Sequence, residues 1–434
     1  MSNKFTKDKV RIGVLGLGVV GSGTVALLNR NREEIEQKIG LPFEIARIAV
    51  RDVNKKRAVE VPRGLLTADP NEIVGDPTID VVCELIGGVE PARTYVLNAL
   101  QAGKQIVTAN KEMIAKVGSG LMEEAARRSL DLQFEGSVAG GIPIIQPMKN
   151  ALAGNSVREV TGIINGTTNY ILTRMTRERA NLDAVLKEAQ QLGYAEADPT
   201  SDVDGFDAQY KIAILASIAF TSRVNVNDVY VEGIRTIGAA DISYADELGY
   251  TIKLLGKGKR LADGRIQVRV HPTLIPNTHP LAATNDVYNA VHIIGDSVGD
   301  VMFYGRGAGS GPTGSAVVGD IIDVCRNLRF GSTGRVSCTC FQHRDVQPID
   351  EVVTRHYIRM VVQDRPRVLA AIAGAFGDHN INIEAMIQKT IHGQQTDIVW
   401  LMHEAPGKAI RDALAVISQQ PVVVEVSNWI RVEE

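Results

Sequence analysis

A glycine-rich turn near the start of the chain constrains its fold most strongly: Gly16-Leu17-Gly18-Val19-Val20-Gly21. The turn follows a short apolar segment, residues 10–15, and opens a stretch with helical spacing that runs to about residue 39. In such a strand–turn–helix unit the first glycine makes the tight turn and the second admits a pyrophosphate. The third lets helix and strand pack closely. Glycines also occur in ordinary turns. The prediction that these six residues bind a dinucleotide at the helix N-terminus therefore depends on the strand before the turn and the helix after it.

The segments that follow the turn predict a parallel sheet. Strands are expected at residues 44–50, 80–86 and 105–109, with helical segments near 93–101 and 119–128. Strands that alternate with helices form right-handed crossovers. The expected fold class is therefore α/β, with a Rossmann-like domain in residues 1–150 that the helix of residues 315–330 completes.

The pattern changes after about residue 150. Long helices and then a run of strands predict an α+β domain in residues 151–328: helices at 181–192 and 207–221, and strands at 229–234, 267–275, 287–294 and 300–304. A polar, irregular stretch predicts a linker at residues 329–350. Residues 351–434 show strands and helices in the order βαββαβ.

Charge and cysteine content exclude several functional classes. The 47 Lys and Arg and 50 Asp and Glu give a net charge of −3, which argues against a general nucleic-acid binder. The longest apolar run, residues 212–220, is about half the length of a membrane span, and the N-terminus lacks the apolar core of a signal peptide. Four cysteines, Cys83, Cys325, Cys338 and Cys340, are too few for a disulfide framework. We therefore expect a cytoplasmic protein that binds neither nucleic acid nor membrane.

Basic residues after the second predicted strand favour NADP over NAD. Arg51 stands where an acidic residue would hold the ribose hydroxyl of NAD, and an arginine suits a 2′-phosphate. Lys55, Lys56 and Arg57 follow closely. Asp52 could still serve NAD, and these basic residues could form a solvated helix end. Gly87 and Gly88, after the strand at residues 80–86, would admit the nicotinamide or its ribose. Gly311, in the glycine-rich stretch 305–314, completes the predicted cofactor-binding residues.

The densest chemistry lies in residues 193–211, which carry five carboxylates and end in a helix that is apolar on every face beyond Lys211. Asp207 and Lys211 are four residues apart, so they share one face of that helix. A lysine at the mouth of a buried helix is partly desolvated and suited to proton transfer. The alternatives are a surface ion pair and a carboxylate site for a divalent metal.

Three further segments supply candidate polar groups. Lys111 follows a predicted strand end, where its ammonium could polarise a bound carbonyl or carboxylate. The loop that contains Gly166 and Thr167 either caps a helix or presents hydroxyls and amides to a polar metabolite. The turn at residues 135–143 exposes backbone carbonyls beside Glu135 and could hold a monovalent cation, although a structural turn is the simpler interpretation.

The chain resembles the homoserine dehydrogenase family over roughly residues 10–330. The resemblance rests on the cofactor turn, on Thr108-Ala109-Asn110-Lys111, on residues 135–143 and 165–170, and above all on Ala189-x3-Gly193-Tyr194-Ala195-x2-Asp198-Pro199-x2-Asp202-Val203-x-Gly205-x-Asp207-x3-Lys211. It implies NAD(P)-dependent interconversion of L-homoserine and L-aspartate 4-semialdehyde, in threonine, methionine and isoleucine biosynthesis.

The same resemblance implies roles for individual residues. Lys211 would donate or accept the proton, with Asp207 and Lys111 beside it. Glu196 would hold the substrate ammonium, and Gly166, Thr167 and Asp202 would complete the substrate site. Sodium would be bound by four residues, the last three through main-chain oxygens: Glu135, Val138, Gly140 and Ile142.

The C-terminal βαββαβ segment resembles the ACT domain, a module that binds amino acids. Its matching stretch surrounds Asp364, Arg367 and Asn380, although the family commonly has glycine where this chain has Arg367. The resemblance implies allosteric regulation by L-threonine, with an assembly role as the alternative. A homodimer formed through the second domain, or a homotetramer, is expected. The alternative functions are a dehydrogenase of another small amino or hydroxy acid, and a non-catalytic sensor of NADP and an amino acid.

Overall fold

The computed structural model describes residues 6–336, 338–392 and 395–433, so Ser337 of the predicted linker lies outside the described residues. The chain forms two compact units, each built from separate stretches of sequence. The first takes residues up to 160 together with 210–228 and 289–344, and the second takes 161–209, 229–288 and the residues from 345 onward. The first unit therefore includes the helix of residues 315–330 that was expected to complete the first domain, and it also includes residues 210–228.

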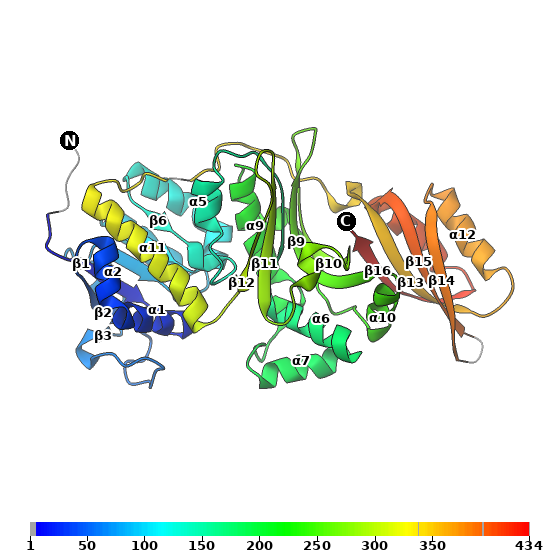
Figure 1. The fold of residues 1–434 in the computed structure, drawn as a ribbon, viewed down its shortest axis with the longest axis horizontal. Coiled ribbons are helices and arrows are strands. Elements are labelled where there is room, and N and C mark those ends of the chain that lie inside the picture. The colour runs from blue at the N-terminus through cyan, green and yellow to red at the C-terminus, as the bar shows by residue number, and fades with distance from the viewer. Residues whose placement is uncertain (1–5, 337, 393–394, 434) are drawn as a thin grey trace. The chain divides into compact units, whose positions relative to one another are not determined.

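A six-stranded sheet forms the centre of the first unit, in the order β3-β2-β1-β4-β5-β6 (Figure 1). All five neighbouring strand pairs in it are parallel. Its strands are β1 (Val10–Leu15), β2 (Phe43–Ala49), β3 (Leu66–Thr67), β4 (Val81–Glu84), β5 (Gln105–Thr108) and β6 (Leu132–Gln133). The predicted parallel sheet is confirmed. The chain adds β2 and β3 on one side of β1 and then crosses to add β4, β5 and β6 on the other side. Open sheets of this kind bind ligands beside such a crossing point, beyond the carboxyl ends of the strands.

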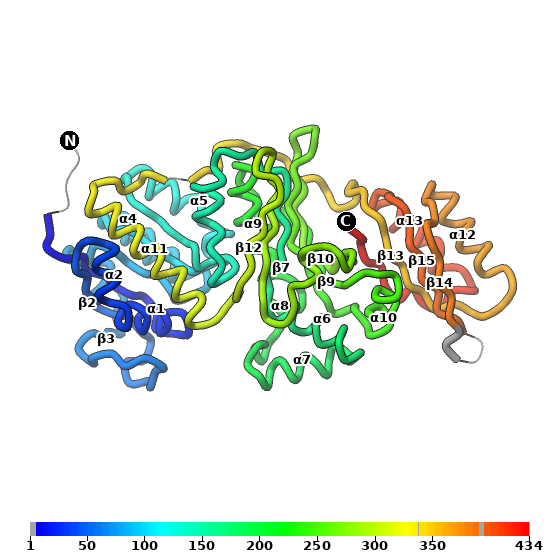
Figure 2. The backbone as a smooth tube through the Cα atoms, in the orientation of Figure 1, coloured from blue at the N-terminus to red at the C-terminus, as the bar shows by residue number. Residues whose placement is uncertain are grey.

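Helices cover this sheet: α1 (Val19–Arg30), α2 (Arg32–Ile39), α3 (Asn71–Val74), α4 (Ala92–Gln101), α5 (Lys111–Arg127) and α11 (Ser310–Phe330). Figures 1 and 2 show α11 beside α1 although almost 300 residues separate them in the chain. Glycine permits this approach, because a Cβ on Gly23 would lie 2.0 Å from the carbonyl oxygen of Ser310. The strands β11 (Tyr288–Gly295) and β12 (Gly299–Arg306) precede α11.

Three helices differ from the sequence-based expectation. The helix expected at residues 315–330 begins at Ser310. The helix expected from residue 19 to 39 is divided at Asn31 into α1 and α2. The helix expected near residues 119–128 begins at Lys111, because the side chain of Asn110 accepts a hydrogen bond from the backbone N–H of Met113 and caps α5.

The second unit contains a mixed sheet in the order β9-β10-β16-β13-β15-β14, with β8 parallel to β10. Its first strands are β8 (Tyr230–Val231), β9 (Tyr250–Arg260) and β10 (Ile266–Pro276), and β7 (Val157–Ile163) runs across the boundary between the units. The helices are α6 (Gly166–Glu178), α7 (Leu182–Gln191), α8 (Thr200–Val203) and α10 (Ala239–Glu247). The strand predicted at residues 229–234 is only two residues long, and β9 was not predicted.

The C-terminal segment has the predicted βαββαβ order: β13 (Val353–Gln363), α12 (Val368–Asp378), β14 (Ile383–His392), β15 (Gln395–Pro406), α13 (Gly407–Ile417) and β16 (Val423–Val432). Its core is buried between strands and helices, with Ile358, Met360, Ile372, Phe376 and Trp400 among its members. β16 pairs with β10 in parallel, so this segment extends the sheet of the second unit.

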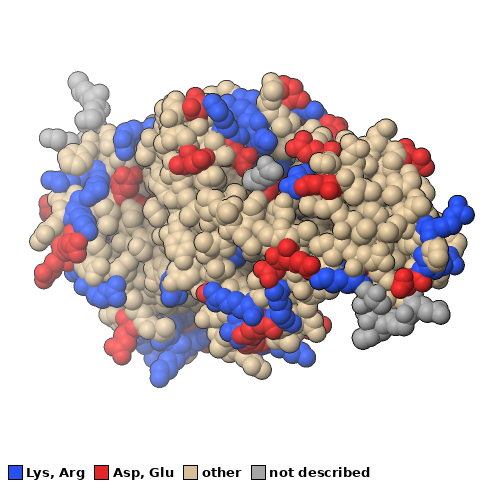
Figure 3. Space-filling view, turned by 45° about the vertical axis from the view of Figure 1, so that its right-hand side comes forward, with Lys and Arg blue, Asp and Glu red and all other residues tan. Residues whose placement is uncertain are grey.

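Charged side chains are interspersed on the face drawn in Figure 3, where Lys and Arg lie among Asp and Glu. This distribution agrees with the small net charge and shows no single basic area on that face. In the described part of the chain, no helix has the length and apolar character that crossing a membrane requires.

Candidate active site

The glycine turn between β1 and α1 has the geometry that each glycine was predicted to supply. Gly16 has a φ of +101°, and a Cβ there would lie 2.7 Å from the carbonyl oxygen of Leu85. A Cβ on Gly21 would lie 2.2 Å from the carbonyl oxygen of Gly16. Gly18 precedes the first turn of α1 and has open space around it, and Val19 is 69% exposed. The turn therefore leaves the N-terminus of α1 accessible to a phosphate.

Gly87 and Gly88 follow β4 with φ values of +87° and +73°. The buried carboxylate of Glu84 fixes this turn, since it accepts hydrogen bonds from the N–H of Ile86 at 2.8 Å and from the hydroxyl of Thr108 at 2.7 Å. Burial raises the pKa of Glu84. Sequence reasoning missed this residue. The sequence feature that could have indicated its role is a carboxylate directly after the apolar residues of a central strand.

Asn110 joins this turn to the start of α5. Its side-chain amide donates to the carbonyl oxygen of Gly88 at 2.6 Å, while its oxygen caps the helix through Met113. Lys111, the first residue of α5, is half-buried. The structure thus brings Gly88 and the Lys111 segment together at the carboxyl edge of the sheet.

Arg51 lies just beyond β2 and is exposed. Within the described ranges its guanidinium has no hydrogen bond or ion pair to protein. Arg57, in contrast, donates to the main-chain oxygens of Asp52 and Lys55. Gly311 lies in the first turn of α11, where a Cβ would meet open space, and the adjacent Ser310 contacts Gly23 of α1.

Asp207 and Lys211 both lie on α9 (Phe206–Ala219), one helical turn apart. They are 3% and 8% exposed, and the helix beyond them is buried from Ile212 to Ala216. The predicted burial of this helix is confirmed, so a surface ion pair does not describe these two residues.

Asn165 organises the carboxylates of this segment. Its side-chain amide donates to Asp202 at 2.6 Å and to Asp207 at 2.9 Å, and its oxygen caps α6 by accepting from the N–H of Thr168 at 2.8 Å. The helix cap was one of the two interpretations of this loop, and it is confirmed, whereas the contacts of Asn165 with Asp202 and Asp207 were not predicted. These contacts bring together residues 37 and 42 positions away in the sequence.

The remaining predicted substrate residues lie near α6 and α7. The hydroxyl of Thr167 donates to the carbonyl oxygen of Tyr194 at 2.8 Å, which ties the start of α6 to the segment that carries Glu196. The Glu196 side chain is exposed, and in the part of the chain that the structure describes its carboxylate has no protein partner. An unpaired carboxylate of this kind is available to a substrate ammonium.

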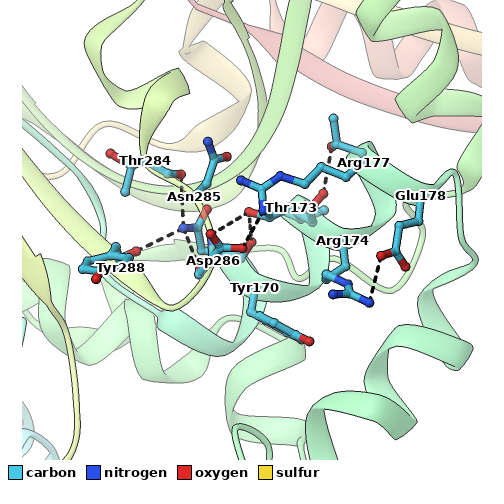
Figure 4. A network of polar contacts seen from close by, with 12 residues as sticks. Tyr170, Thr173, Arg174, Arg177, Glu178, Thr284, Asn285, Asp286 and Tyr288 are labelled. Carbon is cyan, nitrogen blue, oxygen red and sulfur yellow. Dashed lines mark hydrogen bonds and ion pairs between the residues drawn. The ribbon is translucent and has the colours of Figure 1, made fainter. Parts of the chain in front are cut away.

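A polar network anchors α6 to the loop at residues 284–288, and Figure 4 shows part of it. The amide of Asn169 donates to the main-chain oxygens of Thr284, Asp286 and Tyr288. The hydroxyl oxygen of Thr173 accepts from the N–H of Asp286 at 3.0 Å, and Arg177 pairs with the carboxylate of Asp286 at 2.9 Å. These contacts hold α6, and therefore Asn165 at its N-terminus, in one position.

The carboxylate of Glu135 is buried and accepts hydrogen bonds from the N–H groups of Ile144, Ile145 and Gln146 at 2.5, 2.8 and 2.7 Å. Burial raises the pKa of Glu135, although these hydrogen bonds lower it. Val138 and Ile142 are buried in the same loop, and Gly140 has a φ of +52°. Among the described residues, no group of three or more His, Cys, Asp or Glu side chains is placed to hold a metal ion, so the divalent-metal alternative for residues 193–211 lacks support.

The predicted regulatory residues lie at the two ends of α12. Arg367 precedes the helix with a φ of +74°, and Asn380 follows it with a φ of +57°. Asp364 follows β13. The backbone of Arg367 is left-handed, a conformation that glycine adopts at the lowest cost.

Family models match three successive parts of the chain. They describe a homoserine dehydrogenase NAD binding domain at residues 16–135, homoserine dehydrogenase at 143–322 and an ACT domain at 356–419. A homoserine dehydrogenase from Synechocystis sp. is 47% identical over 98% of this chain and 99% of its own length.

Solved structures are similar as well. A homoserine dehydrogenase from Thiobacillus denitrificans is 44% identical, with a TM-score of 0.93 and 98% of both chains covered. A hyperthermophilic archaeal homoserine dehydrogenase mutant in complex with NADPH is 26% identical, with a TM-score of 0.62, over 73% of this chain and 97% of that one. The family models together include the glycine turn, α9 and most of the C-terminal βαββαβ segment.

Proposed function

Because this chain belongs to the homoserine dehydrogenase family, we propose that Lys211 transfers the proton when L-homoserine and L-aspartate 4-semialdehyde interconvert. The protein is an NAD(P)-dependent oxidoreductase. The observation that carries the proposal is a lysine only 8% exposed on a buried helix, one turn after a carboxylate that Asn165 holds in place.

The residues of the chain account for the proton, whereas the nicotinamide cofactor supplies or accepts the hydride when bound. The glycine turn of residues 16–21 fits such a cofactor, because Gly18 leaves open space at the N-terminus of α1. In the direction of semialdehyde reduction, Lys211 donates a proton to the aldehyde oxygen and stabilises its developing negative charge. Asp207 orients that ammonium, and Lys111 adds a second positive charge for the substrate.

Substitution of Lys211 tests this assignment. Lys211→Ala is expected to lower kcat for homoserine oxidation by about 10²–10⁴-fold, the usual contribution of a positioned acid or base. Cofactor binding, followed by the fluorescence of the reduced nicotinamide, is expected to stay within about twofold. Turnover of Lys211→Ala at the wild-type rate would show that the proton passes through another group.

Glu196 is proposed to bind the substrate ammonium, with Gly166, Thr167 and Asp202 completing the substrate site. The exposed, unpartnered carboxylate of Glu196 and the link from Thr167 to Tyr194 support this proposal. A substrate that lacks the amino group distinguishes this role. Glu196→Gln should raise KM for homoserine and leave the weak turnover of the deaminated analogue unchanged. If Glu196→Gln lowered turnover of both substrates equally, Glu196 would have a structural role and would not bind the ammonium.

NADP is proposed as the preferred cofactor, on the strength of the exposed and unpartnered guanidinium of Arg51. A related archaeal enzyme mutant has been solved in complex with NADPH. Arg51→Ala should raise KM for NADP by roughly 10–100-fold, the value of one charge-assisted hydrogen bond, and leave KM for NAD unchanged. Arg57→Ala is the matched control, because Arg57 already donates to its own loop. Equal effects of Arg51→Ala on both cofactors would remove the basis for this preference.

A sodium ion is proposed at the loop of Glu135, Val138, Gly140 and Ile142. A cation fits a buried carboxyl whose pKa burial has raised, because the positive charge would offset the cost of desolvation. Three backbone N–H groups already bind this carboxylate, so main-chain oxygens would supply most of the ligands. Sodium chloride should then raise the melting temperature more than choline chloride at equal ionic strength, and equal effects would exclude the site.

L-Threonine is proposed as an effector that binds near Asp364, Arg367 and Asn380. The ACT domain match and the left-handed turns at both ends of α12 support this proposal. Binding to the native state would raise the melting temperature and change the activity. Threonine without effect on either would leave an assembly role for the domain.

A homodimer or homotetramer and a cytoplasmic location stay predictions. Light scattering coupled to gel filtration would test the oligomeric state.

A further inference from the structure

Cys338 and Cys340 line a cavity that the proposed reaction does not use. The cavity has a volume of about 450 Å³ and lies within the first unit, against α5 and the part of α9 beyond Lys211. Apolar side chains such as Ile114, Met122 and Ile218 form much of its wall. The charged or titratable groups facing it are Lys116, Lys149, Arg223, Asp228 and His343.

The two cysteines are one residue apart in the chain, and both side chains line this cavity. The thiol of Cys340 donates to the carbonyl oxygen of Ser217 on α9 at 3.4 Å. The chain turns at Cys340, where the N–H of Phe341 donates to the carbonyl oxygen of Thr339 at 3.1 Å.

Lys149 supplies positive charge to this pair. It belongs to the π-helical segment Pro147–Ala151, and its ammonium lies 4.8 Å from the centre of the Phe134 ring. In the described part of the chain, Lys149 has no carboxylate within ion-pair distance. Arg223, which pairs with Glu123, also lowers the pKa of Cys338. Lys116 instead pairs with Glu112 at 2.7 Å.

We propose that Cys338 and Cys340 form a modification site, at which Cys338 attacks a hydroperoxide or a similar small electrophile in the cavity and Cys340 then closes a disulfide with it. The neighbouring Cys340 and the positive charges of Lys149 and Arg223 lower the pKa of Cys338 to about 6. This favours the thiolate, which is the nucleophilic form. The remaining cysteines differ, because burial raises the pKa of Cys83 and of Cys325.

The chemistry balances with the peroxide as the only added reagent. The thiolate of Cys338 attacks one oxygen, the O–O bond breaks, and hydroxide leaves as the sulfenic acid forms. The sulfur of Cys340 then attacks the sulfenic sulfur, the S–O bond breaks, and water leaves with the proton of the Cys340 thiol. Two thiols are oxidised to one disulfide, and hydrogen peroxide is reduced to two waters.

Alkylation of the full chain by iodoacetamide, read by peptide mass spectrometry, tests the first step. Cys338 should be alkylated with a half-maximal rate near pH 6, against roughly 8.5 for an ordinary thiol. Cys83 and Cys325 should stay unmodified in the folded protein. A half-maximal pH near 8.5, or a rate for Cys338 no higher than that of the buried cysteines, would overturn the proposal.

A pair of lysine variants tests the cause. Lys149→Met should move the half-maximal pH of Cys338 upward, whereas Lys116→Met, at the same cavity, should leave it unchanged. Equal shifts in the two variants would contradict the role given to Lys149.

Hydrogen peroxide tests the second step. The wild-type peptide should lose two hydrogen atoms and recover them with dithiothreitol. Cys340→Ser should accumulate a sulfenic acid that dimedone traps, and Cys338→Ser should give neither product. Direct conversion of Cys338 to sulfinic acid in the wild type, with no disulfide, would exclude Cys340 as the resolving thiol.

Discussion

The buried carboxyl of Glu84 controls the shape of the turn that carries Gly87 and Gly88. It accepts from two backbone N–H groups of the turn and from the hydroxyl of Thr108 on the neighbouring strand. A buried donor that loses its acceptor costs more than an ordinary hydrogen bond contributes. One side chain therefore links the stability of the sheet to the position of the cofactor turn.

Removal of this carboxyl should destabilise the chain and weaken cofactor binding together. Glu84→Ala is expected to lower the free energy of unfolding by about 1–3 kcal/mol for each donor left buried without a partner. Glu84→Gln keeps one accepting oxygen and should lose less. Urea denaturation followed by circular dichroism measures the difference, and an alanine variant as stable as the wild type would contradict this role.

At the residue level, the sequence predicted side chains whose function follows from local pattern. The glycine turn and the Asp207–Lys211 spacing are of this kind, because a tight turn and a helix face each involve only a few successive residues. The roles of Glu84 and Asn165 depend on partners distant in the chain, such as Thr108 and Asp202. No local pattern specifies those pairings, so they could not be predicted.

At the level of elements, the end of β16 is fixed to β9 and β10 by a buried ionic group. Glu433 pairs with Arg269 of β10 at 2.6 Å and with Lys257 of β9. Burial alone would raise the pKa of Glu433, but the two cations hold it well below its usual range. The contribution of Glu433 to stability is therefore fully present above its unfolded pKa of 4.5, and it is lost as the pH falls toward the folded pKa.

The variant Glu433→Gln should lack this pH dependence of stability. At pH 7 the substitution is expected to lower the free energy of unfolding by about 3–5 kcal/mol, because Arg269 and Lys257 stay buried without a counter-charge. The difference from the wild type should narrow as the pH falls below about 4.5. Chemical denaturation between pH 3 and pH 7 measures it, and a constant difference across this range would contradict the assignment.

Element boundaries show the same limit of local reasoning. Local patterns of apolar residues predicted α7, α9 and the whole βαββαβ segment within a few residues. β9 was missed because it is buried along most of its length and contains lysines that the sequence presents as surface residues, although Lys253 and Lys257 are buried. Their burial depends on partners such as Asn169 and Glu433, which only the fold supplies.

At the scale of the whole molecule, the C-terminal segment is continuous with the second unit. β16 pairs with β10, and Asp241 of α10 accepts from Arg359 at 2.7 Å, from Tyr357 at 3.1 Å and from Asn428 at 3.0 Å. Asp241 is fully buried. An effector bound to the C-terminal segment could therefore act on α10 through a single carboxylate.

Asp241→Ala should weaken this connection. Arg359 would be left largely buried without its main partner, which is expected to cost about 3–5 kcal/mol. Calorimetry should show a lower melting temperature, and any stabilisation by threonine should spread less to the rest of the chain. Asp246→Ala is the control, because Asp246 forms an exposed pair with Arg179 and should change little. Equal losses in the two variants would contradict the special role of Asp241.

Rescue of Lys211→Ala by added primary amines tests the central claim most directly. If the ammonium at this position transfers the proton, methylamine should restore part of the lost kcat for homoserine oxidation in proportion to its concentration. The same amine should not restore Asp207→Ala, whose lysine is still present. The account would be contradicted if Lys211→Ala, before any amine is added, kept a kcat within about tenfold of the wild type. Loss of a general acid or base usually lowers the rate by more than this.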